Sequence, residues 1–143
     1  MFMGEYNHTI DEKGRIVIPA RFRDSFGSHL VVTKGFEGSL NIYQTERFDK
    51  IAEGLSALSD NKKDNREYKR LFISKAIECE IDSQNRINLS ATLIKAGNLT
   101  KQCVFVGSID HLELWSLEAW KAWYDAHDDR FEEVAENLTQ IND

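Results

Sequence analysis

Four basic side chains lie close together near the start of the chain and form the strongest candidate binding site in the sequence. They are Lys13, Arg15, Arg21 and Arg23. Ammonium and guanidinium groups bind phosphate oxygens, and an arginine can also pair with the edge of guanine through two hydrogen bonds. The acidic residues Asp11, Glu12 and Asp24 interrupt the group. The chemistry that this segment favours is the binding of a polyanion.

No comparable set of residues indicates catalysis or metal binding. The histidines are scattered, and Cys79 and Cys103 lack the CxxC spacing of a metal site. The best carboxylate pair for acid–base chemistry is Asp11 with Asp82, but an arginine four residues after each would keep it ionised. We therefore expect no enzyme, no catalytic residue, no metal, no cofactor and no small-molecule substrate. We expect both cysteines to be reduced and packed as small apolar residues.

The basic segment belongs to a unit that occurs twice. The pattern Ile-Asp-x-x-x-Arg-Ile-x-Ile-x-Ala at residues 10–20 returns at residues 81–91 with one leucine in place of isoleucine, and residues 32–48 match 104–120 at a slightly larger offset. Both copies keep the aspartate and the arginine, as Asp11 with Arg15 and as Asp82 with Arg86.

Differences between the copies separate two kinds of residue. Lys13, Arg21 and Arg23 are replaced by Gln84, Thr92 and Ile94. We interpret Asp11, Asp82 and Arg86 as a structural motif, since an aspartate can accept backbone N–H groups of a turn and an arginine can bind a carboxylate. The cations found only in the first copy are the better candidates for a partner.

Each copy predicts the same order of elements. Apolar residues alternate on both sides of residues 11–14, which predicts a tight hairpin or a strand–turn–strand unit that ends at Pro19. Further strands are predicted at 30–33, 40–43, 104–106 and 112–115, and amphipathic helices around Phe48–Leu55, Tyr68–Ala76, Trp120–Tyr124 and Phe131–Leu138. We divide the chain into a first repeat with its helix (1–58), a connecting segment and helix (59–78), a second repeat with its helix (79–124) and an acidic C-terminal helix or tail (125–143).

The charge distribution decides whether an anionic partner is possible. The 143 residues carry a formal charge of −6, which at first argues against nucleic acid. Residues 125–143 hold seven acidic and one basic side chain, so residues 1–124 sum to zero. The sequence also shows no secretory signal and no apolar run long enough for a membrane span, and we expect a cytoplasmic protein without a membrane partner.

The duplicated motif carries a family resemblance. The segments DEKGRIVIPA (11–20) and DSQNRINLSA (82–91), followed by GSLNIY (38–43) and DHLELW (110–115), resemble the MraZ family of bacterial transcriptional regulators, over nearly the whole chain. The resemblance implies an α+β fold with a duplicated swapped-hairpin AbrB-like β-barrel core and surrounding helices. One departure is Ser90, which stands where the first motif has Pro19.

The resemblance also implies a function. It implies a ring-shaped homo-oligomer that is associated with the nucleoid, binds repeated elements in double-stranded promoter DNA and regulates the division and cell-wall gene cluster. Carried onto this sequence, the DNA-binding residues are Lys13 and Arg15, with Arg21 and Arg23.

Several alternatives stay open at this point. The chain could instead be an AbrB-like antitoxin that neutralises a protein partner, or a ring-forming scaffold that acts through protein partners without DNA. Arg15 could pair only with Asp11 or a neighbouring acid, and Arg21 and Arg23 could belong to a solvated strand or helix start. The tryptophans fit a core or an interface between copies, and the acidic tail fits a solvated helix.

Overall fold

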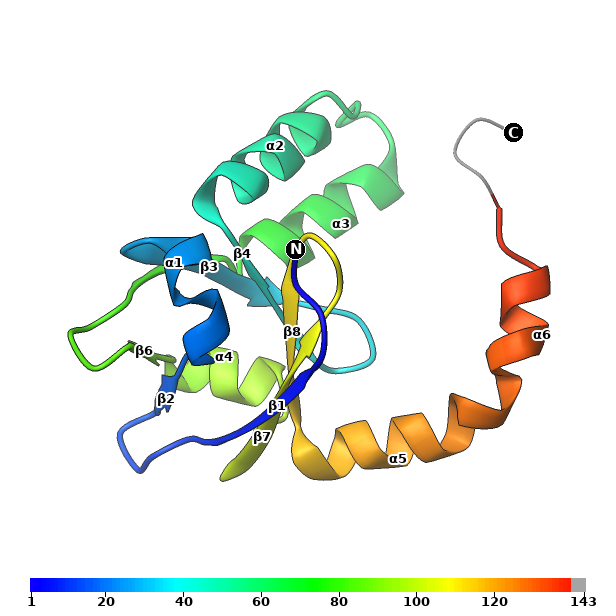
Figure 1. Cartoon of the computed structure of the whole chain (residues 1–143). Coiled ribbons are helices and arrows are strands. Elements are labelled where there is room, and N and C mark those ends of the chain that lie inside the picture. Colours follow the sequence, from blue (N-terminus) through cyan, green and yellow to red (C-terminus); the bar gives the residue numbers. More distant parts are fainter. Residues whose placement is uncertain (140–143) are drawn as a thin grey trace.

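The computed structural model describes residues 1–139 and shows one large antiparallel sheet, a small ribbon and helices around them (Figure 1). The first repeat contains β1 (Glu5–Thr9), β2 (Arg15–Val17), η1 (Ala20–Phe22), α1 (Arg23–Phe26), β3 (His29–Lys34), β4 (Leu40–Tyr43) and α2 (Thr45–Ser56). The helix α3 (Lys63–Ile73) connects the repeats. The second repeat contains β5 (Ile77–Glu80), β6 (Arg86–Asn88), α4 (Ala91–Ala96), β7 (Gln102–Gly107), β8 (Leu112–Ser116) and α5 (Leu117–His127). The described chain ends with η2 (Asp128–Arg130) and α6 (Phe131–Glu136), and the predicted C-terminal helix or tail extends into residues 140–143, which lie outside the described residues.

The two repeats exchange strands. The sheet has the order β1-β7-β8-β4-β3-β5, so the first strand of each repeat pairs with a strand of the other repeat. In these pairs Tyr6 lies opposite Phe105, and Leu30 lies opposite Cys79. The strands β4 and β8 pair at the centre and join the halves. This symmetric order relates the repeats by an approximate two-fold axis and is the swapped arrangement that the family resemblance implies.

The α+β class is confirmed, but the expected closed barrel is wrong. The sheet keeps β1 and β5 as its edges and is not closed into a barrel by hydrogen bonds. Of the two alternatives predicted for the first motif, the structure shows the strand–turn–strand unit, because β1 pairs with β7 and β2 pairs with β6. Local alternation of apolar residues predicts a strand but cannot choose its partner.

The hydrophobic core lies between the sheet and the ribbon formed by β2 and β6. Ile16 and Ile87 face each other in the ribbon and are fully buried against core residues of the sheet. Burying one such side chain contributes about 1.5–3 kcal/mol. The short helices after β2 are held by Phe22, whose ring centroid lies 5.1 Å from that of Phe2 and 5.3 Å from that of Tyr6. This packing fixes the position of the exposed residues on either side of Phe22.

The predicted strands and amphipathic helices are present, with differences at their ends. α3 ends at Ile73, so Lys75 and Ala76 of the predicted helix lie beyond it. The helices α1 and α4 were not predicted, because elements of four and six residues are too short to show a helical period. Among residues 1–139 no helix is long and apolar enough to cross a membrane.

Candidate nucleic-acid interface

Asp11 builds the first turn and holds Arg15 at the same time. Its Oδ1 atom accepts the backbone N–H groups of Lys13 and Arg15, both at 2.9 Å, and its Oδ2 atom accepts the Nε–H of Arg15 at 2.7 Å. The backbone N–H of Arg15, more than any other group, lowers the pKa of the Asp11 carboxyl. The carboxylate is therefore ionised at neutral pH and stays paired with the guanidinium.

The second motif repeats this geometry. Asp82 accepts the backbone N–H groups of Gln84 and Arg86 at 2.9 Å, and the Nε–H of Arg86 at 2.9 Å. The backbone N–H of Arg86 is the main cause of the lowered pKa of Asp82. Gly14 and Asn85 occupy the same place in the two turns, with φ of 81° and 62°. Glycine and asparagine are the residues that adopt this left-handed conformation most readily.

Pairing of β2 with β6 brings the two arginines to one surface. Arg15 lies opposite Asn88, and Val17 lies opposite Arg86, on either side of the buried pair of isoleucines. Since side chains alternate along a strand, these four residues share the face that points away from the core. A rise of about 3.3 Å per residue and a strand spacing of about 4.8 Å place the Cα atoms of Arg15 and Arg86 roughly 8 Å apart.

Each guanidinium group is bound through one of its three nitrogen atoms, and the other two are available to bind a ligand. Only the Nε atoms of Arg15 and Arg86 are bound to the aspartates, and the terminal Nη atoms have no hydrogen bond within residues 1–139. Both side chains are partly exposed. A guanidinium held in this way has already lost much of its rotamer freedom, so a ligand that binds its free end loses less entropy.

The other predicted cations lie at the two ends of the ribbon. Lys13 is exposed in the first turn, next to the start of β2. Arg21, in η1, and Arg23, at the start of α1, are exposed and follow the other end of β2. The antiparallel pairing places the second turn at that end, where the N–H of Ile18 donates to the carbonyl of Asn85 at 2.8 Å. None of these three cations forms an ion pair within residues 1–139.

The structure adds residues that sequence reasoning did not select. Asn88 and Val17 are the added residues, and they complete the outer face of the ribbon. Arg86, which the sequence indicated only as part of the structural motif, lies on the same face as Arg15. The sequence signal for these residues is the alternation of polar and apolar side chains along residues 86–88. It identifies the outer face of the ribbon only once the pairing of β6 with β2 is known. The acidic α5–α6 region lies on the opposite side of the molecule from the ribbon (Figure 1).

The described residues show no metal centre. Residues 1–139 contain no group of three or more histidine, cysteine, aspartate or glutamate side chains that could hold an ion. Both cysteines are free and buried, and burial raises the pKa of Cys79 and of Cys103 to about 11. These thiols are therefore neutral and poorly nucleophilic at neutral pH.

Comparisons with known proteins match the chain to one protein family. The family described as "MraZ protein, putative antitoxin-like" matches the chain twice, at residues 1–71 and 72–142. The chain is 45% identical over 142 residues to a protein of Ligilactobacillus salivarius (strain UCC118) named transcriptional regulator MraZ, with 99% of both chains covered. It is 42% identical over 142 residues to a protein of the same name from Thermoanaerobacter sp. (strain X514), again with 99% of both chains covered. A third such protein, from Limosilactobacillus reuteri (strain DSM 20016), is 44% identical over 138 residues, which are 96% of this chain and 97% of the relative.

The double match follows the two repeats that exchange strands in the structure. It covers almost every residue of the chain, and the relatives match over nearly their full lengths. These three relatives are named as regulators of transcription and not as enzymes. On this evidence the chain belongs to the MraZ family.

Proposed function

We propose that this protein regulates transcription by binding double-stranded promoter DNA with the outer face of its β2–β6 ribbon. The observation that carries the proposal is the pair of aspartate-held arginines, Arg15 and Arg86, on one face of a two-stranded ribbon. The major groove of B-DNA is wide enough for such a ribbon. The names of the relatives, all transcriptional regulators, support the same role.

Each basic residue has a distinct part in this proposal. Arg15 binds a guanine edge or a flanking phosphate with its free Nη atoms, and Lys13 at the turn binds phosphate. Arg21 and Arg23 bind the DNA backbone beyond the other end of the ribbon. Asp11 and Asp82 keep the turns and guanidinium groups in place. Asp82 holds Arg86 in the same way as Asp11 holds Arg15. Arg86 therefore contacts DNA only if the ribbon enters the major groove far enough to bring both arginines to the bases or phosphates.

Assembly into a ring is part of the proposal. One copy offers few phosphate contacts, and each contact adds only modestly to affinity and is sensitive to salt. Several copies that bind successive DNA elements at once raise the affinity by about 10²–10⁴ when the spacing fits. We propose that such a ring acts in the nucleoid on repeated elements in front of the division and cell-wall gene cluster.

The test compares two arginines that are both paired with aspartate. Arg15→Ala should weaken binding to the cognate promoter fragment by about 5–150-fold per engaged copy, which corresponds to roughly 1–3 kcal/mol for one specific contact. Arg47→Ala is the matched control. Arg47 lies on α2, outside the ribbon, and its Nη2 atom pairs with Asp110 Oδ2 at 2.8 Å. Fluorescence anisotropy with labelled DNA measures both variants. Equal affinity of Arg15→Ala and wild type would remove Arg15 from the interface.

Two further measurements separate the possible contacts and the alternative functions. If Arg15 reads a base, its loss should reduce cognate binding much more than nonspecific binding; a uniform loss with a smaller salt dependence indicates phosphate. Footprinting on the region upstream of the protein's own gene tests DNA binding and element spacing together. A wild-type ring that protects no DNA would favour the scaffold function.

A further inference from the structure

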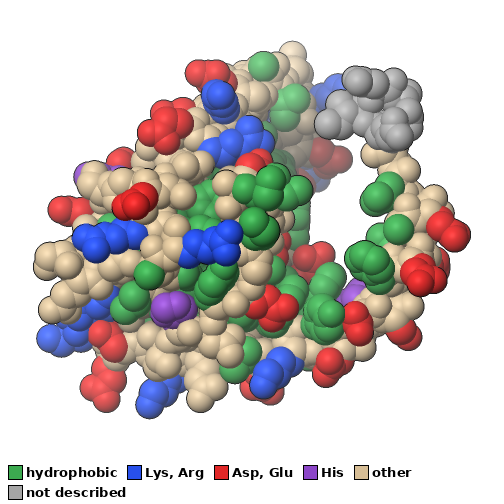
Figure 2. Space-filling model, viewed as in Figure 1, with side chains coloured by type: hydrophobic (Ala, Val, Ile, Leu, Met, Phe, Trp, Pro, Cys, Tyr) green, Lys and Arg blue, Asp and Glu red, His purple; other side chains and the backbone are tan. Residues whose placement is uncertain are grey.

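The C-terminal part of the described chain forms an arm that its own body does not cover. The arm (residues 117–139) starts against the sheet, where the Nε1–H of Trp120 donates to Glu5 Oε1 at 2.9 Å. It then runs outward through η2 into α6, and open space separates its end from the body (Figures 1 and 2). Phe131 and Leu138 are 78% and 75% exposed. Together with other side chains of α5 and α6 they line an apolar hollow of about 540 Å³.

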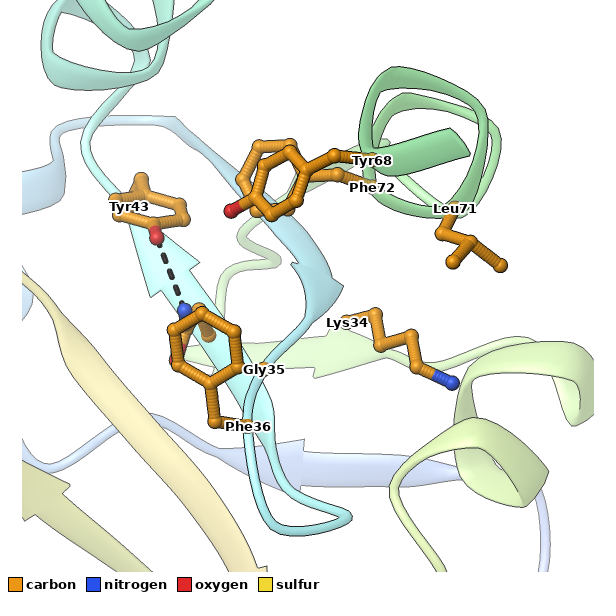
Figure 3. A pocket seen from close by; sticks show the side chains of 8 residues that line it. Lys34, Gly35, Phe36, Tyr43, Tyr68, Leu71 and Phe72 are labelled. Carbon is orange, nitrogen blue, oxygen red and sulfur yellow. Dashed lines mark hydrogen bonds between the residues drawn. The ribbon is translucent and has the colours of Figure 1, made fainter. Parts of the chain in front are cut away.

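A second uncovered apolar surface lies beside α3. Figure 3 shows Tyr68 and Phe72 on α3 facing Tyr43 across a pocket, with Phe36 on its opposite wall. The pocket measures about 190 Å³, and Phe36 and Leu71 at its rim are 69% and 59% exposed. We call this surface the α3 groove. Large exposed apolar side chains gathered around a hollow are typical of a protein contact.

Asn41 lies at the base of the α3 groove. Its side chain is buried, and its Nδ2 atom donates to the hydroxyl of Tyr43 at 2.9 Å. Its Oδ1 atom is buried without a hydrogen-bond partner in residues 1–139. Because this oxygen is buried beneath the lining of the groove, the contact proposed below is carried by the apolar and charged side chains around the groove.

The two surfaces carry opposite charge. The arm holds seven acidic and two basic side chains, a net charge of −5. Residues 62–75, which contain α3, hold six basic and two acidic side chains, a net charge of +4. Lys34 lines the groove itself, whereas Lys69 is already paired with Asp60 at 2.8 Å. Apolar patches bordered by opposite charges are complementary both in burial and in electrostatics.

We propose that the arm of one copy docks into the α3 groove of a second copy of this chain. The apolar side chains of α6 cover Phe36 and Leu71, and the acidic residues of the arm face the basic residues of α3. Because the two surfaces differ, an open assembly of any length still offers one free arm at one end and one free groove at the other. Addition therefore continues head to tail until the assembly closes. This inference rests on the proposed ring and names the surfaces that build it.

The experiment uses two double variants of exposed residues. The arm variant is Phe131→Ser with Leu138→Ser, and the groove variant is Phe36→Ser with Leu71→Glu. Size-exclusion chromatography with light scattering should show a closed oligomer for the wild type and a monomer for each variant. Ile109→Asn is the control, because Ile109 is 72% exposed and lies outside both surfaces, with a φ of 69° that asparagine tolerates. It should assemble as the wild type does.

Mixing the two variants gives the decisive result. The groove variant keeps an intact arm and the arm variant keeps an intact groove, so an equal mixture should form a dimer with one junction and no ring. Contact between like surfaces would give no such dimer. On a promoter fragment with several elements, each variant alone should bind about 10²–10⁴-fold more weakly than the wild type, because avidity is lost.

The outcomes separate this inference from the proposed function. If both variants form the same ring as the wild type, the arm contact is overturned and the proposal of a ring stands. A wild type that stays monomeric overturns the ring and the arm contact together. Loss of DNA binding by Arg15→Ala in an intact ring reports on the ribbon alone. Far-UV circular dichroism spectra like that of the wild type and a cooperative urea transition in both variants show that the substitutions act on the contact and not on the fold, since loss of assembly by itself lowers the urea midpoint.

Discussion

Replacing Gly14 by alanine tests how tightly the first turn is built against the ribbon. Gly14 has a φ of 81°, and a Cβ atom at this position would lie 2.7 Å from the carbonyl oxygen of Leu89. That neighbour cannot simply rotate away, because the Leu89 N–H donates to the carbonyl of Gly14 at 2.8 Å. The substitution therefore strains the turn and disturbs the hydrogen bond between the two motifs.

The expected loss of stability follows from three contributions. A non-glycine residue in this conformation costs about 1–3 kcal/mol, and weakening one backbone hydrogen bond costs about 1 kcal/mol. The unfolded alanine variant has less conformational entropy than the unfolded wild type, which stabilises the folded state by about 0.4–1 kcal/mol. The free energy of unfolding should thus fall by roughly 1–4 kcal/mol, which lowers the urea midpoint by about 0.5–2 M for a slope near 2 kcal/mol/M.

Gly54→Ala is the matched control for the same chemical change. Gly54 lies within α2, and a Cβ atom there would meet nothing within 4 Å. Alanine should raise stability by about 0.5–1 kcal/mol, because glycine is unfavourable inside a helix. Urea unfolding followed by tryptophan fluorescence, at one protein concentration, measures both variants. A Gly14→Ala protein within about 0.5 kcal/mol of the wild type would refute the account of the turn given above.

Two predictions concern titrating groups. Asp11 has a lowered pKa, so its contribution to stability is present above its ordinary value of 3.8 and is lost as the pH falls through the folded value. Asp11→Asn should therefore be less stable than the wild type in urea at pH 7, and the difference should shrink below about pH 4; a constant difference would contradict the ionised pair. Burial raises the pKa of Cys79 and Cys103 from 9.0 to about 11, so stability should decline as the pH rises from 9.0 through 11. Both thiols should resist iodoacetamide at pH 8 in the native protein and react in urea, whereas fast labelling of folded protein would contradict their burial.

The order of elements could be predicted because its signals are local. The expected strand at 40–43 has the same bounds as β4, and the expected strand at 30–33 lies within β3. The apolar period of residues 48–55 marked α2 in the same way. Each of these patterns arises from apolar side chains of one element that are buried or partly buried, so it is visible without knowledge of the partner.

The composition of the candidate site could be predicted only in part. Lys13 and Arg15 stand beside a recognisable turn, and the duplication drew attention to both aspartate–arginine pairs. That Arg86 shares a face with Arg15 depends on the register of β2 with β6, in which residues 71 positions apart along the chain become neighbours. Pairing between distant strands is decided by the packing of the whole sheet, and nothing within residues 82–91 specifies it.

The exchange of strands has a consequence for synthesis of the protein on the ribosome. β1 is made first but pairs with β7, and β2 pairs with β6, so neither has its partner until the second repeat has emerged. At about 5–20 residues per second the first strand waits several seconds. A chain released early would carry Lys13 and Arg15 on an unpaired segment, without the ribbon that holds them on one face. Formation of the ribbon therefore requires a polypeptide that extends at least through β6, because only such a chain contains both motifs.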